Sequence, residues 1–170
     1  MENIELYKEF YFREIDRRYE LDNSINIPIL IISGIVSIHV FLYSQEIPSS
    51  ILLASKILTF LCFGFGIFSF YYLLKSFSNF FRNHTYRELA SMNSFLKYEN
   101  SLLEKHETIT AKKEFDDYLK KEFAECNEHN YKINIGRMEN LAKAKSGIFY
   151  SLSLTLFSAI TYIISIIITQ

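Results

Sequence analysis

Five small or polar side chains recur within one long apolar stretch of the sequence, at alternating steps of four and three residues. They are Ser55, Thr59, Cys62, Gly66 and Ser69. This period places them on one face of a helix, where small residues let another helix pack closely and hydroxyl groups can line a polar path. The stripe therefore indicates either a packing seam between helices or the wall of a pore, and its spacing fits both.

A second stripe follows the same period near the end of the chain, and two ionisable residues lie in apolar surroundings elsewhere. The second stripe consists of Ser151, Thr155, Ser158, Tyr162, Ser165 and Thr169. Lys56 lies beside the start of the first stripe, and His39 lies opposite a row of serines. Each is predicted either to meet a polar partner or a lipid headgroup, or to act in gating at a pore mouth. We favour packing for Gly66 and a conduit role nearer Ser55 and Lys56.

A third group of polar residues lies in the charged part of the sequence, on two stretches predicted to be helical. The first stretch carries His84, Glu88 and Ser91. The second carries a polar ladder made of Asn127, Asn130, Asn134 and Arg137. Polar residues at the core positions of paired helices fix register and oligomeric state, at some cost in stability. We prefer this interpretation to a ligand-binding site, which the same residues leave open.

The sequence gives little support for metal or enzyme chemistry. His84 and Glu88 are spaced i, i+4 and come level with Cys126 and His129, but zinc requires four ligands that converge on one point. The glycine patterns that bind phosphates or dinucleotides are absent from the sequence, and so is a nucleophile elbow. We therefore expect no enzyme, no metal and no cofactor.

Three apolar segments carry the two stripes and His39. They cover residues 25–44, 51–74 and 148–169, and Lys56 is the only Lys, Arg, Asp or Glu among them. Each segment is long enough to supply the roughly 20 helical residues that cross the hydrocarbon core of a bilayer. The sequence therefore predicts an all-α integral membrane protein with three transmembrane helices.

The distribution of Lys and Arg predicts the orientation of these spans. Residues 75–147 hold most of the 18 Lys and Arg residues, and residues 1–24 hold several more. The connector "SQEIPSS" and the C-terminal tail hold none. Because cytoplasmic loops carry an excess of positive charge, we expect the N-terminus and residues 75–147 in the cytoplasm and the C-terminus outside. The predicted location is the bacterial inner membrane.

Residues 75–147 are predicted to form a long cytoplasmic helical hairpin that is continuous with spans two and three. No Pro or Gly interrupts residues 67–135, and apolar residues recur there at helical spacing. The one interruption is "EKHETITAKK", in which Thr110 can cap a helix. We expect span two to continue as one helix to about residue 105, and a second helix to run from about residue 111 into span three.

Residues 1–24 are predicted to form an amphipathic cytoplasmic helix. Its apolar face consists of Ile4, Tyr7, Tyr11, Ile15 and Tyr19. The opposite face carries more acidic than basic side chains, whereas helices that lie on a membrane surface are normally rich in Lys and Arg. We therefore prefer packing against the hairpin or a neighbouring subunit to binding at the lipid surface.

This order of elements resembles a family of membrane effectors. It comprises a charged amphipathic helix ("FYFREIDRRYE"), two spans with a very short connector, a long helical region, and "NEHNYKINIGRMENLAKAKSG" entering the last span. It is similar to the small membrane effectors of bacterial anti-phage systems, such as SLATT-type proteins and the multi-spanning accessory proteins of RNA-targeting CRISPR loci. A third span departs from the two-span SLATT pattern. The resemblance implies an oligomeric protein that perturbs or permeabilises the inner membrane after infection is sensed.

The expected function is that of an oligomeric inner-membrane effector that forms a pore or perturbs the membrane, in anti-phage defence. The alternative is a non-conducting scaffold or sensor anchor whose cytoplasmic hairpin binds a partner protein. The expected partners are further copies of the chain, membrane lipids and a cytosolic defence-system protein. The formal net charge of −1 argues against direct binding of nucleic acid.

Overall fold

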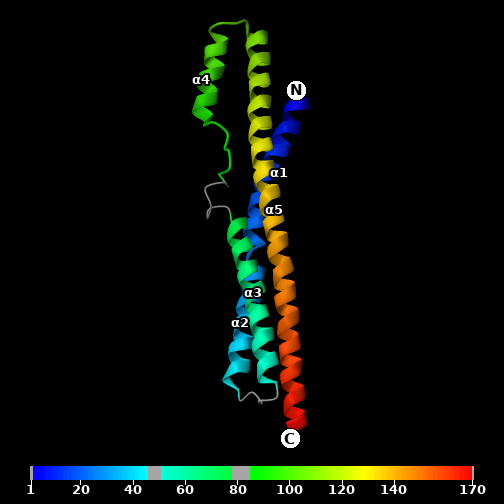
Figure 1. Cartoon of the computed structure of the whole chain (residues 1–170). Helices are drawn as coiled ribbons and strands as arrows, with labels where there is room; N and C mark the ends of the chain where they lie inside the picture. Colours follow the sequence, from blue (N-terminus) through cyan, green and yellow to red (C-terminus); the bar gives the residue numbers. More distant parts are fainter. Residues whose placement is uncertain (1, 46–50, 78–84, 170) are drawn as a thin grey trace. The chain divides into compact units, whose positions relative to one another are not determined.

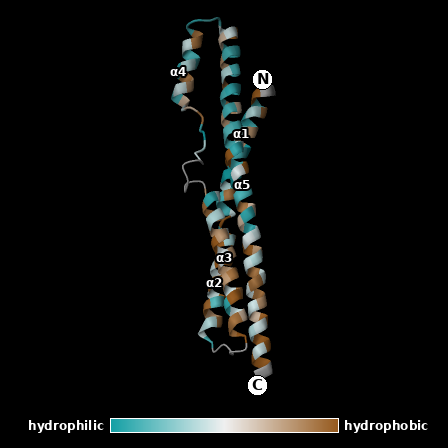
Figure 2. Cartoon of the chain, in the orientation of Figure 1, coloured by the Kyte–Doolittle hydropathy of each residue, from teal (hydrophilic) through white to brown (hydrophobic). Residues whose placement is uncertain are grey.

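The computed structural model describes residues 2–45, 51–77 and 85–169, and every regular element among them is a helix. These helices are α1 (Glu2–Asn23), α2 (Asn26–Ser44), α3 (Leu52–Ser76), α4 (Met92–Leu103) and α5 (Thr108–Thr169) (Figure 1). Three helical stretches are long and apolar enough to cross a membrane: α2 with the preceding α1, α3, and α5. Figure 2 shows the apolar residues gathered on α2, α3 and the C-terminal part of α5. The prediction of an all-helical chain with three apolar helices of spanning length is confirmed.

A proline explains why α1 and α2 are separate helices. Pro28 is the third residue of α2. It has no N–H to donate to the carbonyl of Ser24, four residues earlier, and its ring crowds that carbonyl. The helix is therefore interrupted at residues 24 and 25, close to the predicted boundary at the start of the first apolar segment.

The expected continuity between span two and the following helix is wrong. Helix α3 ends at Ser76, where Phe77 has an extended backbone with φ −75° and ψ 127°. Residues 85–91 are not helical, and α4 begins only at Met92, where the Ser91 side chain accepts a hydrogen bond from the N–H of Ser94. The sequence contains no helix breaker here, so the cause is tertiary: side chains of α5 bind the backbone of residues 85–88 (next section).

Helices α4 and α5 run antiparallel on either side of residues 104–107. The ring of Phe95 contacts that of Tyr118, and the ring of Tyr98 contacts that of Phe115. The predicted interruption is therefore present but shorter, and Thr110 lies inside α5 rather than at its cap. As expected, the second helix runs without a break into the third apolar segment, giving α5 a length of 62 residues.

The chain divides into two compact units. The first contains residues 1–20 and 81–136, and the second contains residues 21–80 and 137–170. Helix α5 contributes to both. In the second unit, α2, α3 and α5 pack side by side (Figure 1). Their apolar core at the start of α2 is formed by Leu21, Ile25, Leu73, Leu141 and Ala144.

The buried face of α1 differs from the predicted one. Tyr11 is buried and its ring contacts Phe123 of α5, as expected for a helix that packs on its own chain. Tyr7 and Tyr19, however, are exposed, and the buried neighbour of Tyr11 is Glu14. The difference arises because Asn134 of α5 supplies a hydrogen-bond partner for Glu14, so a polar residue lies on the inner face.

Candidate functional site

In the first unit, Asn130 of α5 binds the backbone of the non-helical residues 85–91, called the extended segment below. Its side-chain oxygen accepts a hydrogen bond from the Arg87 N–H at 2.8 Å, and its side-chain N–H donates to the Arg87 carbonyl at 3.0 Å. An asparagine amide carries the same donor and acceptor as a peptide group, so this pair replaces the hydrogen bonds that a helix would supply. The Nε2 of His129, the residue before Asn130, lies 2.9 Å from the Thr85 carbonyl oxygen.

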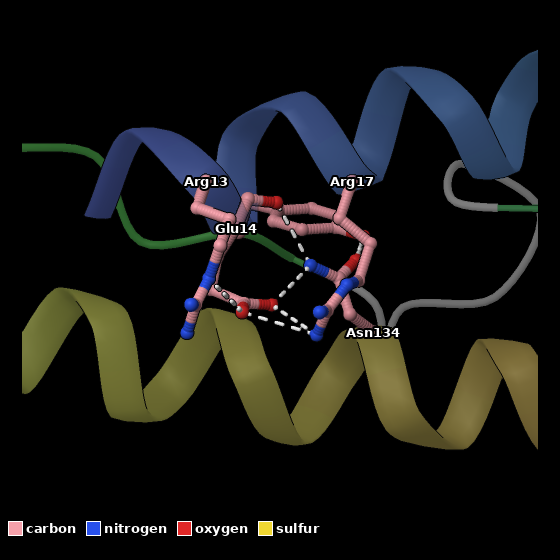
Figure 3. A network of polar contacts seen from close by, with 5 residues as sticks. Arg13, Glu14, Arg17 and Asn134 are labelled. Carbon is pink, nitrogen blue, oxygen red and sulfur yellow. Dashed lines mark hydrogen bonds and ion pairs between the residues drawn. The ribbon is translucent and has the colours of Figure 1, made fainter. Parts of the chain in front are cut away.

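A second network surrounds Glu14, whose side chain is 1% exposed. Asn134 donates to the Glu14 carbonyl oxygen at 2.8 Å and to its carboxylate at 3.0 Å, and Tyr86 donates to the Asn134 oxygen at 2.5 Å. The Arg17 guanidinium donates to both carboxylate oxygens at 3.1 Å, and Arg13 lies 3.9 Å from one of them (Figure 3). The network joins α1, α5 and the extended segment, and it compensates the buried negative charge.

Two further polar side chains of this unit have buried atoms without a partner in the described part of the chain. The Arg18 guanidinium stacks on the Tyr86 ring at 4.7 Å, but its Nε is buried and unpaired. The side-chain oxygen of Asn127 is also buried and unpaired. The predicted ladder thus divides: Asn130 and Asn134 bind backbone groups, whereas Asn127 does not make a comparable bond. His84 lies outside the described residues.

Glu88 and Cys126 meet through the backbone rather than through metal-binding atoms. The Glu88 side chain is exposed, and the Cys126 thiol points to the Glu88 carbonyl oxygen at 3.8 Å. No cluster of three or more His, Cys, Asp or Glu side chains suited to a metal ion occurs in the ranges that the structure describes. Burial raises the pKa of the Cys126 thiol, and it also raises the pKa of Tyr11 in the same unit.

Arg137, the last member of the predicted ladder, belongs to the second unit and is fully buried. Its Nε donates to the Ser76 carbonyl at 2.7 Å, and the Ser76 hydroxyl donates to the Arg137 carbonyl at 3.1 Å. Its Nη2 donates to the Asp22 carboxylate at 2.5 Å. The ion pair therefore joins the end of α1 to α5, and the two hydrogen bonds with Ser76 join the end of α3 to α5.

The two stripes meet each other within one chain. The Cys62 thiol lies 3.1 Å from the Ser151 hydroxyl and 3.2 Å from the Thr155 hydroxyl, and Ser151 donates to the Cys62 carbonyl at 3.0 Å. These three residues are buried, as are Ser69, Ser158 and Ser165. Ser55, Thr59, Gly66 and Tyr162 are half-buried, and Lys56 is exposed.

Helices α3 and α5 make a tight contact at Gly147, which the sequence reasoning did not select. A Cβ atom at Gly147 would lie 2.9 Å from the Phe68 ring and 3.2 Å from the Phe65 carbonyl oxygen, and still closer to the Ser69 hydroxyl. At Gly66, the predicted crossing point, a Cβ would meet only the Ser151 hydroxyl at 4.0 Å. The pattern of small residues four apart, Gly147 and Ser151, was the available signal.

His39 is almost fully buried in the second unit, at 1% exposure. Its Nδ1 lies 3.0 Å from the Ile35 carbonyl oxygen and its ring contacts Phe63 of α3, but its Nε2 has no hydrogen-bond partner among the residues that the structure describes. The buried hydroxyl of Ser158 on α5 is likewise unpaired. The expected polar partner of His39 is therefore a backbone carbonyl on one side, with the other ring nitrogen unsatisfied.

No protein-family model matches the chain, and no curated protein and no solved structure is similar to it.

Proposed function

We propose that the protein is a multi-pass bacterial inner-membrane protein in which the span bundle is an anchor and the first unit binds a cytosolic partner. One observation carries the proposal: Cys62 of the first stripe bonds to Ser151 and Thr155 of the second within a single chain. Cys62, Ser151 and Thr155 hydrogen-bond one another, so these positions have no free polar groups to line a conduit. A helix bundle whose small polar residues hydrogen-bond across the contact between α3 and α5 suits a scaffold or sensor anchor.

The first unit offers a surface for such a partner. An apolar groove of about 410 Å³ lies between α1, α4 and α5, and its apolar walls include Met92, Phe95 and Phe115. Charged residues Glu5 and Lys8 lie among its lining residues. Exposed apolar grooves with a polar rim are typical of sites that accept an amphipathic helix.

Thiol labelling tests the anchor proposal, because the chain has only two cysteines. In a Cys126→Ala chain, Cys62 should resist a water-soluble methanethiosulfonate in inverted membrane vesicles and react after denaturation. A cysteine-free chain carrying Lys132→Cys, at an exposed position, should react in both states. Labelling of Cys62 in the native membrane would overturn the proposal, since it would place the seam in contact with water.

The proposed topology places the N-terminus and residues 75–147 in the cytoplasm and the C-terminus outside. It rests on the Lys and Arg asymmetry of the sequence. A reporter after Gln170 should be periplasmic, and one inserted near Thr108 cytoplasmic. Both reporters on the same side would exclude this topology.

A second candidate function is an oligomeric pore-forming effector in anti-phage defence. It is favoured by the unpaired Nε2 of His39 and the unpaired hydroxyl of Ser158, both buried in the span bundle. Each of these atoms would gain a hydrogen bond if water entered the bundle, so an open, hydrated state would relieve their burial cost. Wild-type protein in liposomes should then conduct ions, and His39→Leu should reduce the current. Absence of conductance in the wild type would exclude this candidate.

A further inference from the structure

An apolar groove of about 380 Å³ lies between α2 and α5 in the second unit. Its apolar walls are formed by Ile27, Ile31, Ile148, Phe149 and Leu152. Several of these side chains are well exposed, with Ile27 and Phe149 each at 66%. The groove is therefore open along the side of the helices rather than enclosed.

A single cationic residue, Lys145, lines one end of the same groove together with Ser24. Lys145 takes part in no ion pair among the described residues, and no acidic side chain lines the groove. It is also the last charged residue of the sequence, after which α5 is uncharged. Leu152 lies two turns further along α5, about 10 Å away along the helix axis.

We propose that this groove is a binding site for one anionic phospholipid, with the phosphate at Lys145 and an acyl chain along the apolar walls. The inference goes beyond the anchor function, and it rests on the proposed insertion of α2 and α5 in the membrane. At the boundary where α5 becomes uncharged, the lysine ammonium reaches the headgroup layer while the walls face hydrocarbon. Lys145 therefore lies at the depth of the lipid phosphate, and the apolar walls lie at the depth of the acyl chains.

Charge decides which lipid occupies the site. A lysine without a protein partner forms a charge-assisted hydrogen bond to a phosphate oxygen, and basic sites between spanning helices on the cytoplasmic side select headgroups with net negative charge. A zwitterionic choline headgroup places its own positive charge next to Lys145, so its phosphate gains less binding free energy there. We expect phosphatidylglycerol to bind about fivefold more tightly than phosphatidylcholine. This is the gain in affinity that one lysine contributes at an anionic membrane surface.

The absence of Trp from the sequence provides a clean optical test. Phe149→Trp places a single fluorophore in the groove at an exposed position, and Phe60→Trp, 79% exposed on α3, places one outside it. Each variant is reconstituted in vesicles that mix phosphatidylcholine with phosphatidylglycerol, with one of the two lipids brominated on its acyl chains to quench the fluorophore. Phe149→Trp should be quenched preferentially by brominated phosphatidylglycerol, and Phe60→Trp equally by both lipids.

Charge variants in the Phe149→Trp chain complete the test. Lys145→Gln should abolish the preference, whereas Lys143→Gln should retain it, because Lys143 lies over the Tyr72 ring and does not line the groove. Equal quenching of Phe149→Trp by both lipids, or a preference that survives Lys145→Gln, would overturn the lipid site. Failure of the membrane insertion itself would be recognised separately, since neither lipid would then quench Phe60→Trp.

Discussion

Replacing Gly147 with alanine tests whether α3 and α5 pack as closely as the structure indicates. The added Cβ would lie 3.2 Å from the Phe65 carbonyl oxygen, a backbone atom that moves only if the helices separate. It would also displace the Ser69 hydroxyl, which donates to that carbonyl at 2.8 Å. The substitution therefore perturbs both the spacing of the two helices and one hydrogen bond.

The expected change in the free energy of unfolding is the sum of two unfavourable contributions and one favourable contribution. Overpacking a close contact costs about 1–3 kcal/mol, and loss of the Ser69 hydrogen bond costs about 1 kcal/mol. Alanine is favoured over glycine in a helix interior by about 1 kcal/mol. Gly147→Ala should thus lower the free energy of unfolding by about 1–3 kcal/mol, which corresponds to a melting temperature roughly 3–10 °C lower in a chain of this size.

Two other glycines supply matched controls for the same chemical change. A Cβ at Gly64 would meet nothing within 4 Å, and one at Gly66 would make an ordinary contact with Ser151. Gly64→Ala and Gly66→Ala should therefore be as stable as the wild type or slightly more stable, because only the helix propensity changes. Thermal unfolding in detergent, followed by circular dichroism, measures all three variants. A melting temperature of Gly147→Ala equal to that of Gly64→Ala would refute the close crossing.

Three further predictions concern buried polar groups. Asn130→Leu should lower the free energy of unfolding by about 1–3 kcal/mol, because both hydrogen bonds to the Arg87 backbone are lost; unchanged thermal unfolding would contradict this role. Arg137→Met should cost about 2–4 kcal/mol, less than for a fully buried pair because its carboxylate partner is 31% exposed, and a wild-type denaturation midpoint would argue against the ion pair. The free energy of unfolding should fall as the pH rises above about 9, because burial raises the pKa of Cys126 from 9.0 and that of Tyr11 from 10.0, and the unfolded chain therefore loses these protons first. Melting temperatures that stay constant to about pH 11, or that respond identically in Tyr11→Phe, would contradict this.

The sequence predicted the elements whose signal is contained in their own residues. The three apolar helices appear close to their expected bounds, because length and hydropathy alone identify them. The separation of α1 from α2 also has a local cause, since Pro28 removes a helix hydrogen bond. The unbroken course of α5 into the third apolar segment followed from the absence of Pro and from helical spacing.

The features that sequence reasoning missed depend on residues far apart in the chain. Residues 85–91 contain no Pro or Gly, and only the side chains of α5, such as Asn130, show why the helix is replaced there by an extended segment. Glu14 is buried because Asn134 receives it, which no local pattern of α1 reveals. Gly147 could have been selected from its spacing to Ser151. The residue at which two helices make their tight contact, however, depends on both helices and not on the sequence of either one alone.

The contact between Asn130 and the extended segment has a consequence for how this part of the chain can vary. Asn130 binds the N–H and the carbonyl of Arg87, which every residue except proline possesses, and leaves the Arg87 side chain outside the contact. Amino-acid identity at position 87 is therefore nearly unconstrained by this bond, while asparagine at position 130 is not replaceable by an isosteric apolar residue. Among related chains, position 87 should therefore vary more than position 130.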